Sequence, residues 1–316
     1  MELHKISEEI CIKHDAAKER NKQLGVLLKG IVLPSLQKDP LFKALFTEIF
    51  YTGSYYDGVK IGKPDEFDLI LKLRPPFDAD LLEFRYERNN GGQLKIVNMR
   101  YLLNQSTNEI NTKLIEWCGI NGGFDSQQML SWFKDIVKKF LIPELEKNRS
   151  IMLRNNLHYD KMNFGGFAFT FESKEFSIDL VPAFEFKVPY TPKVFAPYNV
   201  RKLPKPILPW FLTPGFKTSN WKMCMKEYEM RLLKNGINSN LKPAIRLIKI
   251  LTELYDRLIK NNTLSYWTCR NDDGVLQTLK TKKIRRELGD EIGECLRKLQ
   301  SAVELGDDVA VRKMFQ

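Results

Sequence analysis

The sequence predicts an α+β protein in which a front half of mixed helices and strands is joined to an α-helical back half. Apolar residues recur at helical spacing over residues 6–36, and short apolar runs typical of strands occupy residues 46–73 and 166–186. Helical spacing returns after residue 221. With 316 residues, the chain is long enough for one large domain or for two joined lobes.

The front half is expected to begin with one long helix over residues 6–36, whose end is bent by Pro34. Strands then alternate with glycine-rich turns and one further amphipathic helix. The expected elements are two strands within Phe46–Leu73 separated by a Gly-Ser turn, a hairpin or loop at Gly91-Gly92, a strand at Leu94–Met99, a helix at Ser126–Asn148, and strands at Gly166–Ser173 and Glu175–Phe186.

A proline-rich passage separates the two halves. Eight prolines lie between Pro182 and Pro214, a density that argues against a continuous helix or a central strand and predicts an ordered crossing between lobes. After it, the pattern predicts helices at Trp221–Lys234, at Leu241–Lys260 and within Thr281–Met314.

The composition is that of an ordinary globular protein, with 43% hydrophobic and 28% charged residues. No stretch approaches the roughly 18 to 20 apolar residues that a membrane span needs, and the charged N-terminus lacks the apolar core of a secretory signal. The five cysteines are scattered, without zinc-ligand spacing. We therefore expect a cytoplasmic protein with free thiols, no membrane partner and no structural zinc.

The segment 52–73, TGSYYDGVKIGKPDEFDLILKL, carries the most informative pattern. A Gly53-Ser54 pair lies ahead of Glu66 and Asp68, which belong to an apolar, strand-like run. Because residues i and i+2 of a strand share a face, both carboxylates point to one place. Carboxylates suit Mg²⁺, and a small flexible turn suits phosphate. The pattern predicts the chemistry of a nucleotidyltransferase.

A third carboxylate is expected at Asp179, in the run FSIDLVPAFEF. Ile178 and Leu180 flank it, so its charge is costly there unless it is paired or bound to metal. Two-metal nucleotidyl transfer uses about three carboxylates. Taken singly, the Gly-Ser pair is a common turn, the Glu-x-Asp pair is commonly a solvated strand face, and a lone Asp is usually salt-bridged. In this order and on strands, the three features are far more specific.

These motifs resemble the nucleotidyltransferase core of cyclic GMP–AMP synthase and its animal relatives, the cGAS-like receptors. The family has a Gly-Ser turn, a Glu/Asp-x-Asp pair and a later Asp between apolar residues, matched here by residues 52–54, 66–68 and 178–180. Asn163-Phe-Gly-Gly-Phe resembles the approach to the third strand. The resemblance implies a bilobal nucleotidyltransferase fold with a long N-terminal spine helix, a mixed β-sheet carrying the active site and a C-terminal helical lobe.

That resemblance also implies boundaries and site roles. It implies a nucleotidyltransferase core with its spine helix over residues 1–200 and the helical lobe over residues 201–316, in one compact unit. Glu66, Asp68 and Asp179 would be catalytic and hold two Mg²⁺ ions, with Mn²⁺ as an alternative. The implied nucleotide-binding residues are Thr52, Gly53, Ser54, Lys222, Lys249, Ser265 and Tyr266, where Lys222 and Lys249 contact phosphates, the Ser265 hydroxyl touches phosphate and the Tyr266 ring stacks on a base.

Basic charge points to a polyanionic partner. The net charge is +11, and residues 201–260 contain thirteen Lys and Arg against four Asp and Glu. A solvated helix face is the ordinary explanation of such a run, but beside a nucleotidyltransferase core it favours nucleic-acid binding. The expected nucleic-acid-binding face joins the first helix to a C-terminal one and consists of Lys13, Lys18, Arg20, Lys22, Lys242 and Arg246.

The zinc-binding insertion of the vertebrate DNA sensor is absent, as in invertebrate receptors, several of which respond to double-stranded RNA. Duplex RNA is recognised mainly through shape, phosphate and 2′-hydroxyl contacts, which a face of Lys and Arg supplies. We therefore favour double-stranded RNA over double-stranded DNA as activator, with a dimer on the nucleic acid as one arrangement.

The sequence thus predicts a nucleic-acid-activated enzyme that makes a cyclic dinucleotide of the cyclic GMP–AMP type from ATP and GTP, in innate antiviral defence. Two alternatives stay open: a catalytically silent scaffold or binding protein with this fold, and a synthase of linear oligonucleotides. The base choice and the linkage isomer are not fixed by the sequence.

Overall fold

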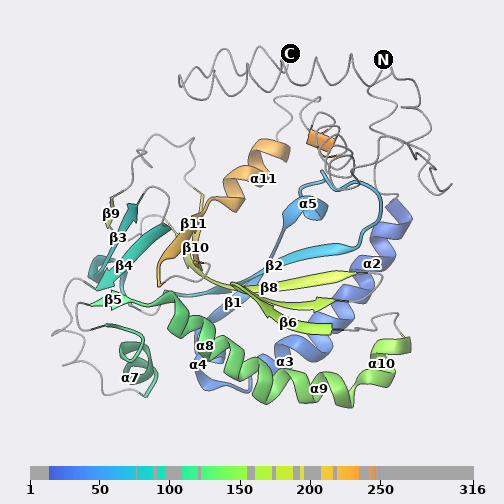
Figure 1. Cartoon of the computed structure of the whole chain (residues 1–316). Coiled ribbons are helices and arrows are strands. Elements are labelled where there is room, and N and C mark those ends of the chain that lie inside the picture. The colour runs from blue at the N-terminus through green and yellow to red at the C-terminus, as the bar shows by residue number, and fades with distance from the viewer. Residues whose placement is uncertain are drawn as a thin grey trace, which may run out of the picture. The chain divides into compact units, whose positions relative to one another are not determined.

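A computed structural model of the chain (Figure 1) describes most of its first 234 residues. The described residues are 14–75, 77–87, 91–96, 109–119, 122–154, 161–172, 176–187, 193–195, 208–215 and 219–234, together with 242, 245, 246 and 249. The chain divides into two compact units. The larger unit contains residues 15–53 and 64–231, and the smaller contains residues 1–14, 54–63 and 232–316.

The larger unit is built on a mixed sheet, which has 11 strands within the described residues. Its path runs β1-β2-β8-β10-β11-β4-β3-β9, with β5 beside β4 and the β6–β7 hairpin beside β8. The pairs β2–β8 and β3–β9 are parallel, and the others are antiparallel. The strands are β1 (Phe46–Thr52), β2 (Glu66–Leu73), β3 (Leu82–Glu87), β4 (Gly91–Ile96), β5 (Gly123–Phe124), β6 (Lys161–Gly165), β7 (Ala168–Glu172), β8 (Ser177–Phe186), β9 (Lys193–Phe195), β10 (Trp210–Pro214) and β11 (Trp221–Cys224).

Two helical rods pack together in this unit. The first is α2 (His14–Leu27), the π-helical turn η1 (Leu28–Val32) and α3 (Leu33–Leu36); the second is α8 (Ser126–Ile136), the π-helical turn η3 (Val137–Leu141) and α9 (Ile142–Lys147). The segments η1 and α3 contact α9 and η3, while α8 packs on β10. Figure 1 shows α8 and α9 below the strands in this view and α2 to the right of them.

The remaining helices are short. They are α4 (Pro40–Leu45), α5 (Gly53–Tyr56), the 3₁₀ turn η2 (Ala79–Leu81), α7 (Glu109–Ile115), α10 (Arg149–Arg154) and α11 (Lys226–Lys234). Asp39 joins α4 to the second rod, because its Oδ1 accepts hydrogen bonds from the Phe42 N–H (2.8 Å) and from the Trp132 indole (3.3 Å). No helix in the described part of the chain is long and apolar enough to span a bilayer.

The expected first helix is confirmed for residues 14–36, and its beginning lies outside the described residues. Pro34 lies inside this helix, and the bend expected there stays a prediction. The helix widens into the π-helical turn just before the proline, where the Leu33 N–H bonds to the Leu28 carbonyl five residues back. Such a turn re-spaces the carbonyls near a proline, which cannot donate a backbone hydrogen bond and crowds the preceding turn. The helix therefore continues to Leu36.

The expectation that the proline-rich passage holds no central strand is wrong. β10 occupies the end of the passage and lies between β8 and β11 in the sheet. Pro182 lies inside β8, within the strand expected at 175–186, and is paired with Leu71 of β2. On the other side of β8, pairing with β7 stops at Leu180 and pairing with β10 starts at Phe184. Pro182 thus falls at a break in that ladder, where a missing N–H costs least.

One further expectation needs correction. Residues 221–224 form strand β11 instead of the first turn of a helix, because they pair antiparallel with β10 and the Gly215 N–H bonds to the Asn220 carbonyl. The hairpin expected at Gly91-Gly92 is confirmed: β3 and β4 pair antiparallel with Glu87 opposite Gly91, and a Cβ at Gly92 would lie 2.1 Å from the Phe84 ring on β3. The helix at 126–148 and the strands at 46–52, 66–73, 168–172 and 177–186 are as expected.

Candidate active site

The three predicted carboxylates lie on two adjacent parallel strands. Asp68 on β2 is the register partner of Asp179 on β8, and Glu66 lies two residues before Asp68. Partners in register share a face of the sheet, so all three carboxylates project from one face. The opposite face of β2 carries Phe67 and Leu69, which are 1% and 0% exposed. Burial of these apolar residues fixes the register and therefore the direction of the carboxylates.

Asp179 has an environment that opposes its ionisation. Burial raises the pKa of this carboxyl, and the negative charges of Glu66 and Glu172 raise it further. A hydrogen bond of 2.6 Å from the Thr170 hydroxyl to Asp179 Oδ1 acts in the other direction and does not cancel the rise.

Thr52 and Gly53, at the end of β1, lie beside Asp68. Thr52 is the antiparallel partner of Asp68, so the two share a face. Gly53 follows with a φ of +84°, and a Cβ there would lie 1.8 Å from Asp68 Oδ2. Only glycine permits this close approach. The Thr52 residue is 4% exposed, and its hydroxyl is buried without a hydrogen-bond partner among the described residues. A buried hydroxyl of this kind is suited to a ligand.

The donor set fits Mg²⁺. Three carboxylates on one face of two paired strands are the oxygen ligands this ion prefers, and the repulsion that raises the pKa of Asp179 is relieved by a bound cation. As the side chains are placed, no group of three or more His, Cys, Asp or Glu within the described residues is close enough together to hold an ion. The register brings the carboxylates to one face; their convergence on a metal stays a prediction.

The smaller unit contains the turn that follows Gly53. The Val59 N–H donates to the Ser54 carbonyl (2.9 Å) and the Gly58 N–H donates to the Tyr55 carbonyl (3.1 Å). With Gly58 at a φ of +69°, these bonds form a Schellman motif that ends helix α5. The buried side chain of Val59 supplies the hydrophobic residue that such a motif usually places after the glycine. A Gly-Val pair after a short helical turn was the sequence signal for this motif.

The other predicted binding residues are placed to different degrees. Lys222 is exposed on β11, and Lys18 and Lys22 are exposed on α2. Arg20 is partly buried, with its guanidinium over the Phe176 ring at 5.6 Å. Lys242, Arg246 and Lys249 have helical conformation in the smaller unit, whereas Lys13, Ser265 and Tyr266 lie outside the described residues.

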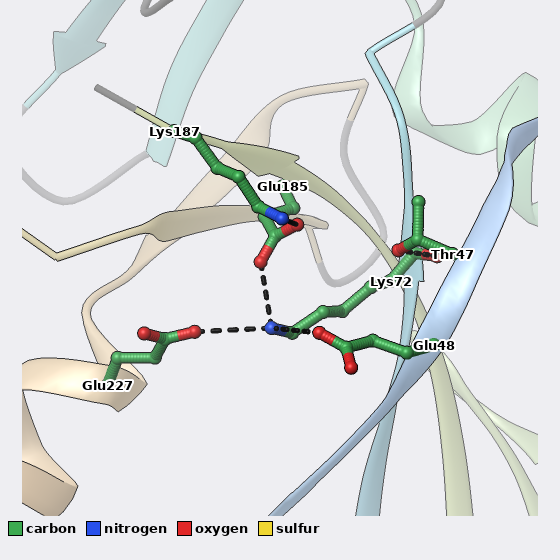
Figure 2. Close-up of polar contacts among 6 residues, drawn as sticks. All are labelled: Thr47, Glu48, Lys72, Glu185, Lys187 and Glu227. Atoms are coloured by element: carbon green, nitrogen blue, oxygen red, sulfur yellow. Dashed lines mark hydrogen bonds and ion pairs between the residues drawn. The ribbon is translucent and has the colours of Figure 1, made fainter. Parts of the chain in front are cut away.

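Sequence reasoning missed a buried charge cluster centred on Lys72 (Figure 2). The Lys72 side chain is 6% exposed, and its Nζ lies 2.7 Å from Glu185 Oε1, 3.1 Å from Glu48 Oε1 and 3.2 Å from Glu227 Oε1. Lys187 pairs with the other Glu185 oxygen at 3.1 Å. Burial lowers the pKa of Lys72, but the ion pairs outweigh burial and leave it raised. A lone lysine in the run EFDLILKL, on the face of Asp68, was the available signal.

A mixed sheet carrying a Gly-Ser turn and register-paired carboxylates is the arrangement that the sequence predicts for a nucleotidyltransferase domain. The chain belongs to the Mab-21 family: the model for the Mab-21 protein nucleotidyltransferase domain matches residues 55–235. This match confirms the predicted α+β nucleotidyltransferase fold.

Curated relatives agree with this family. The chain is 30% identical over 264 residues to a cyclic GMP-AMP synthase-like receptor of Aethina tumida, covering 82% of this chain and 65% of the relative. It is 32% identical over 254 residues to one of Tribolium castaneum (74% and 62%) and 29% identical over 264 residues to one of Microplitis demolitor (79% and 48%). The chain thus matches between about half and two thirds of the length of these relatives. The predicted resemblance to cGAS-like receptors is confirmed.

Proposed function

We propose that this protein is a nucleic-acid-activated nucleotidyltransferase that makes a cyclic dinucleotide of the cyclic GMP–AMP type from ATP and GTP, in antiviral defence. The observation that carries the proposal is the register pairing of Asp68 with Asp179, with the Thr52 hydroxyl and Gly53 beside them. The printed names of the relatives support the cyclic GMP–AMP type, and the net charge of +11 supports a nucleic-acid activator.

In this proposal Glu66, Asp68 and Asp179 hold two Mg²⁺ ions. When bound, the ions activate the attacking hydroxyl and neutralise charge on the leaving pyrophosphate. Asp179 would act as a ligand in its ionised form, which a bound cation would favour over the protonated form. Gly53 lets the backbone come close to Asp68, and the Thr52 hydroxyl is available to an oxygen of the donor nucleotide.

The remaining proposed nucleotide contacts are made by cations and by the base-stacking pair. Lys222 and Lys249 would contact the triphosphate, and Ser54 would anchor the donor phosphate through the Gly-Ser turn. Ser265 and Tyr266 would contact phosphate and base. The proposed duplex contacts are Lys13, Lys18, Arg20, Lys22, Lys242 and Arg246.

The product assay tests the reaction. Purified protein is incubated with labelled ATP and GTP, Mg²⁺, and no nucleic acid, double-stranded RNA or double-stranded DNA. We expect a phosphatase-resistant dinucleotide with RNA alone. Product with DNA alone would keep the enzyme and change the activator, and a phosphatase-sensitive ladder would indicate a linear oligonucleotide synthase. No product across several duplex lengths and with Mn²⁺ would favour a silent scaffold.

Asp68→Asn tests the metal site. The variant keeps the shape of the side chain and removes one anionic ligand, so we expect synthesis to be abolished and duplex binding to be kept. The measurement is the product assay beside a duplex-binding titration on the same preparation. Synthesis retained in Asp68→Asn would remove this residue from the metal site.

A further inference from the structure

The carbonyl of Gly58 is held by a side chain 188 residues further along the chain, within the same smaller unit. Arg246 donates two hydrogen bonds to this one oxygen, from Nη2 at 2.7 Å and from Nε at 3.2 Å. A carbonyl oxygen has two lone pairs, so the two hydrogen bonds from Arg246 use the full accepting capacity of the Gly58 carbonyl. Hydrogen bonds from a charged donor are stronger than those between neutral groups.

A second cation of the same segment lies against the same backbone. A Cβ added at Gly58 would meet the Lys242 Nζ at 3.1 Å. Lys242 and Arg246 both have helical conformation. The cationic groups of both side chains therefore lie beside Gly58.

This contact restrains the whole turn that begins at Ser54. The Schellman bonds join Gly58 to Tyr55 and Val59 to Ser54. The bonds from Arg246 to the Gly58 carbonyl therefore also restrain the backbone of Ser54. Val59 is 5% exposed, which fixes the far end of the turn. A large shift of the turn would break the two bonds from Arg246 to the Gly58 carbonyl.

We propose that Arg246 is a positioning residue for the donor-nucleotide site: it fixes the turn from Ser54 to Val59 by binding the Gly58 carbonyl. The inference rests on the proposed function in one respect, that Ser54 anchors the donor phosphate. It differs from the duplex contact that the family resemblance implies for Arg246, because it assigns two of the guanidinium's N–H donors to the protein's own backbone.

The first test needs no catalysis. Amide hydrogen exchange is followed by mass spectrometry in peptides covering residues 54–63, on the full chain without nucleotide. We expect Arg246→Ala to raise exchange there about tenfold or more, the loss for a hydrogen bond from a charged donor. Arg246→Lys should stay defective, because an ammonium lacks the fork of the guanidinium. Unchanged exchange in Arg246→Ala overturns the proposal, whether or not the protein makes any product.

A double-mutant cycle separates the contact from general damage. Gly58→Ala and Gly62→Ala both place alanine at a positive φ in the same segment, +69° and +75°. Only Gly58 contacts the basic side chains; a Cβ at Gly62 would meet nothing within 4 Å. We expect the exchange effects of Arg246→Ala and Gly58→Ala to be strongly non-additive, and those of Arg246→Ala and Gly62→Ala to be additive. Equal coupling in the two cycles overturns the proposal.

The second test is binding. The affinity for α,β-methylene ATP with Mg²⁺, without nucleic acid, should fall about tenfold in Arg246→Ala and in Arg246→Lys. If amide exchange in residues 54–63 is faster but the affinity for the analogue is unchanged, Arg246 holds the turn without positioning the donor-nucleotide site. That result would overturn the positioning role. Loss of duplex affinity alone, with normal exchange, would return Arg246 to the nucleic-acid face.

Discussion

Gly53 leaves the space that the Asp68 carboxylate occupies. Its φ of +84° needs glycine, and any Cβ there would overlap the Asp68 carboxylate at 1.8 Å. The structure thus gives two separate reasons for glycine at this position, one in the backbone and one in the site. The two reasons can be separated by experiment, because Gly62 also has a positive φ but a Cβ there would meet nothing within 4 Å.

We expect Gly53→Ala to lower activity about a hundredfold, the scale of loss when a reacting group is misplaced by about 1 Å. Gly62→Ala carries a similar backbone cost, about 1 to 2 kcal/mol of the free energy of unfolding, without a contact to displace. The measurement is the product assay together with urea unfolding for both variants. Equal activity losses in the two variants would show that the backbone conformation alone matters.

Asp179 should make the free energy of unfolding depend on pH. Its pKa is raised in the folded chain, so the folded state holds the proton more tightly than the unfolded state. Stability contributed by this group therefore falls as pH rises from its unfolded pKa through its higher folded pKa. In metal-free buffer, Asp179→Asn should raise the free energy of unfolding at pH 7, and the gain should vanish below both pKa values.

Urea unfolding at several pH values in the presence of a chelator measures this effect. Asp135→Asn on α8 serves as a control, because Asp135 is exposed and outside the site. A lower stability of Asp179→Asn at pH 7 would mean that its hydrogen bond from Thr170 outweighs the cost of burying its charge.

At the scale of elements, Lys72 joins four of them. Its ammonium on β2 pairs with Glu48 on β1, Glu185 on β8 and Glu227 at the start of α11. Replacing it with methionine would leave Glu185, whose side chain is 4% exposed, with the exposed Lys187 as its one ion-pair partner among the described residues. We expect Lys72→Met to lower the free energy of unfolding by about 3 kcal/mol.

Two companion variants make this prediction specific. Lys72→Met combined with Glu185→Gln should recover part of the loss, since the buried negative charge is removed as well. Lys38→Met, which breaks the exposed pair with Glu144, should change stability little. A loss in Lys72→Met no larger than that in Lys38→Met would show that the cluster is solvated in solution.

The strands with strong local patterns could be predicted from the sequence, and those that depend on distant partners could not. β2 and β8 stand out as apolar runs with charges at defined positions, and the carboxylates on them were identified for that reason. β10 and β11 are short and follow prolines, so only their pairing with each other and with β8 makes them strands. Their existence is a tertiary effect.

The site shows the same division. The spacing within segment 52–73 predicts two carboxylates on one face, which depends on strand geometry alone. The bonds between Arg246 and Gly58 join residues 188 positions apart, and nothing local in either segment indicates them. The Lys72 cluster likewise needs residues from β1, β8 and α11. Contacts between remote segments require the fold before they can be inferred.

At the scale of the whole molecule, the excess of basic residues predicts salt-dependent binding to duplex RNA. Exposed Lys18 and Lys22 on α2 should each neutralise about one phosphate, so Lys18→Glu with Lys22→Glu should weaken binding and reduce the slope of log affinity against log salt by about 2. Titrations at several salt concentrations measure both quantities.

The matched control changes charge elsewhere. Lys138 and Lys147 are exposed on the second rod, and Lys138→Glu with Lys147→Glu alters the net charge by the same amount. If both double variants lose affinity equally, binding follows net charge and α2 is not the duplex face.

The parallel pairing of β2 with β8 also sets an order in time. β1 and β2 are neighbours in the chain and can pair as soon as both are made, but β2 receives its second neighbour only after residues 74–176 have been synthesised. Until then an apolar strand edge stands open during translation, at the stage when newly made chains aggregate most readily. Asp68 and Asp179 become register partners only after β8 has been synthesised. A chain that stops before β8 therefore has neither the completed sheet nor Asp179, the third predicted metal ligand.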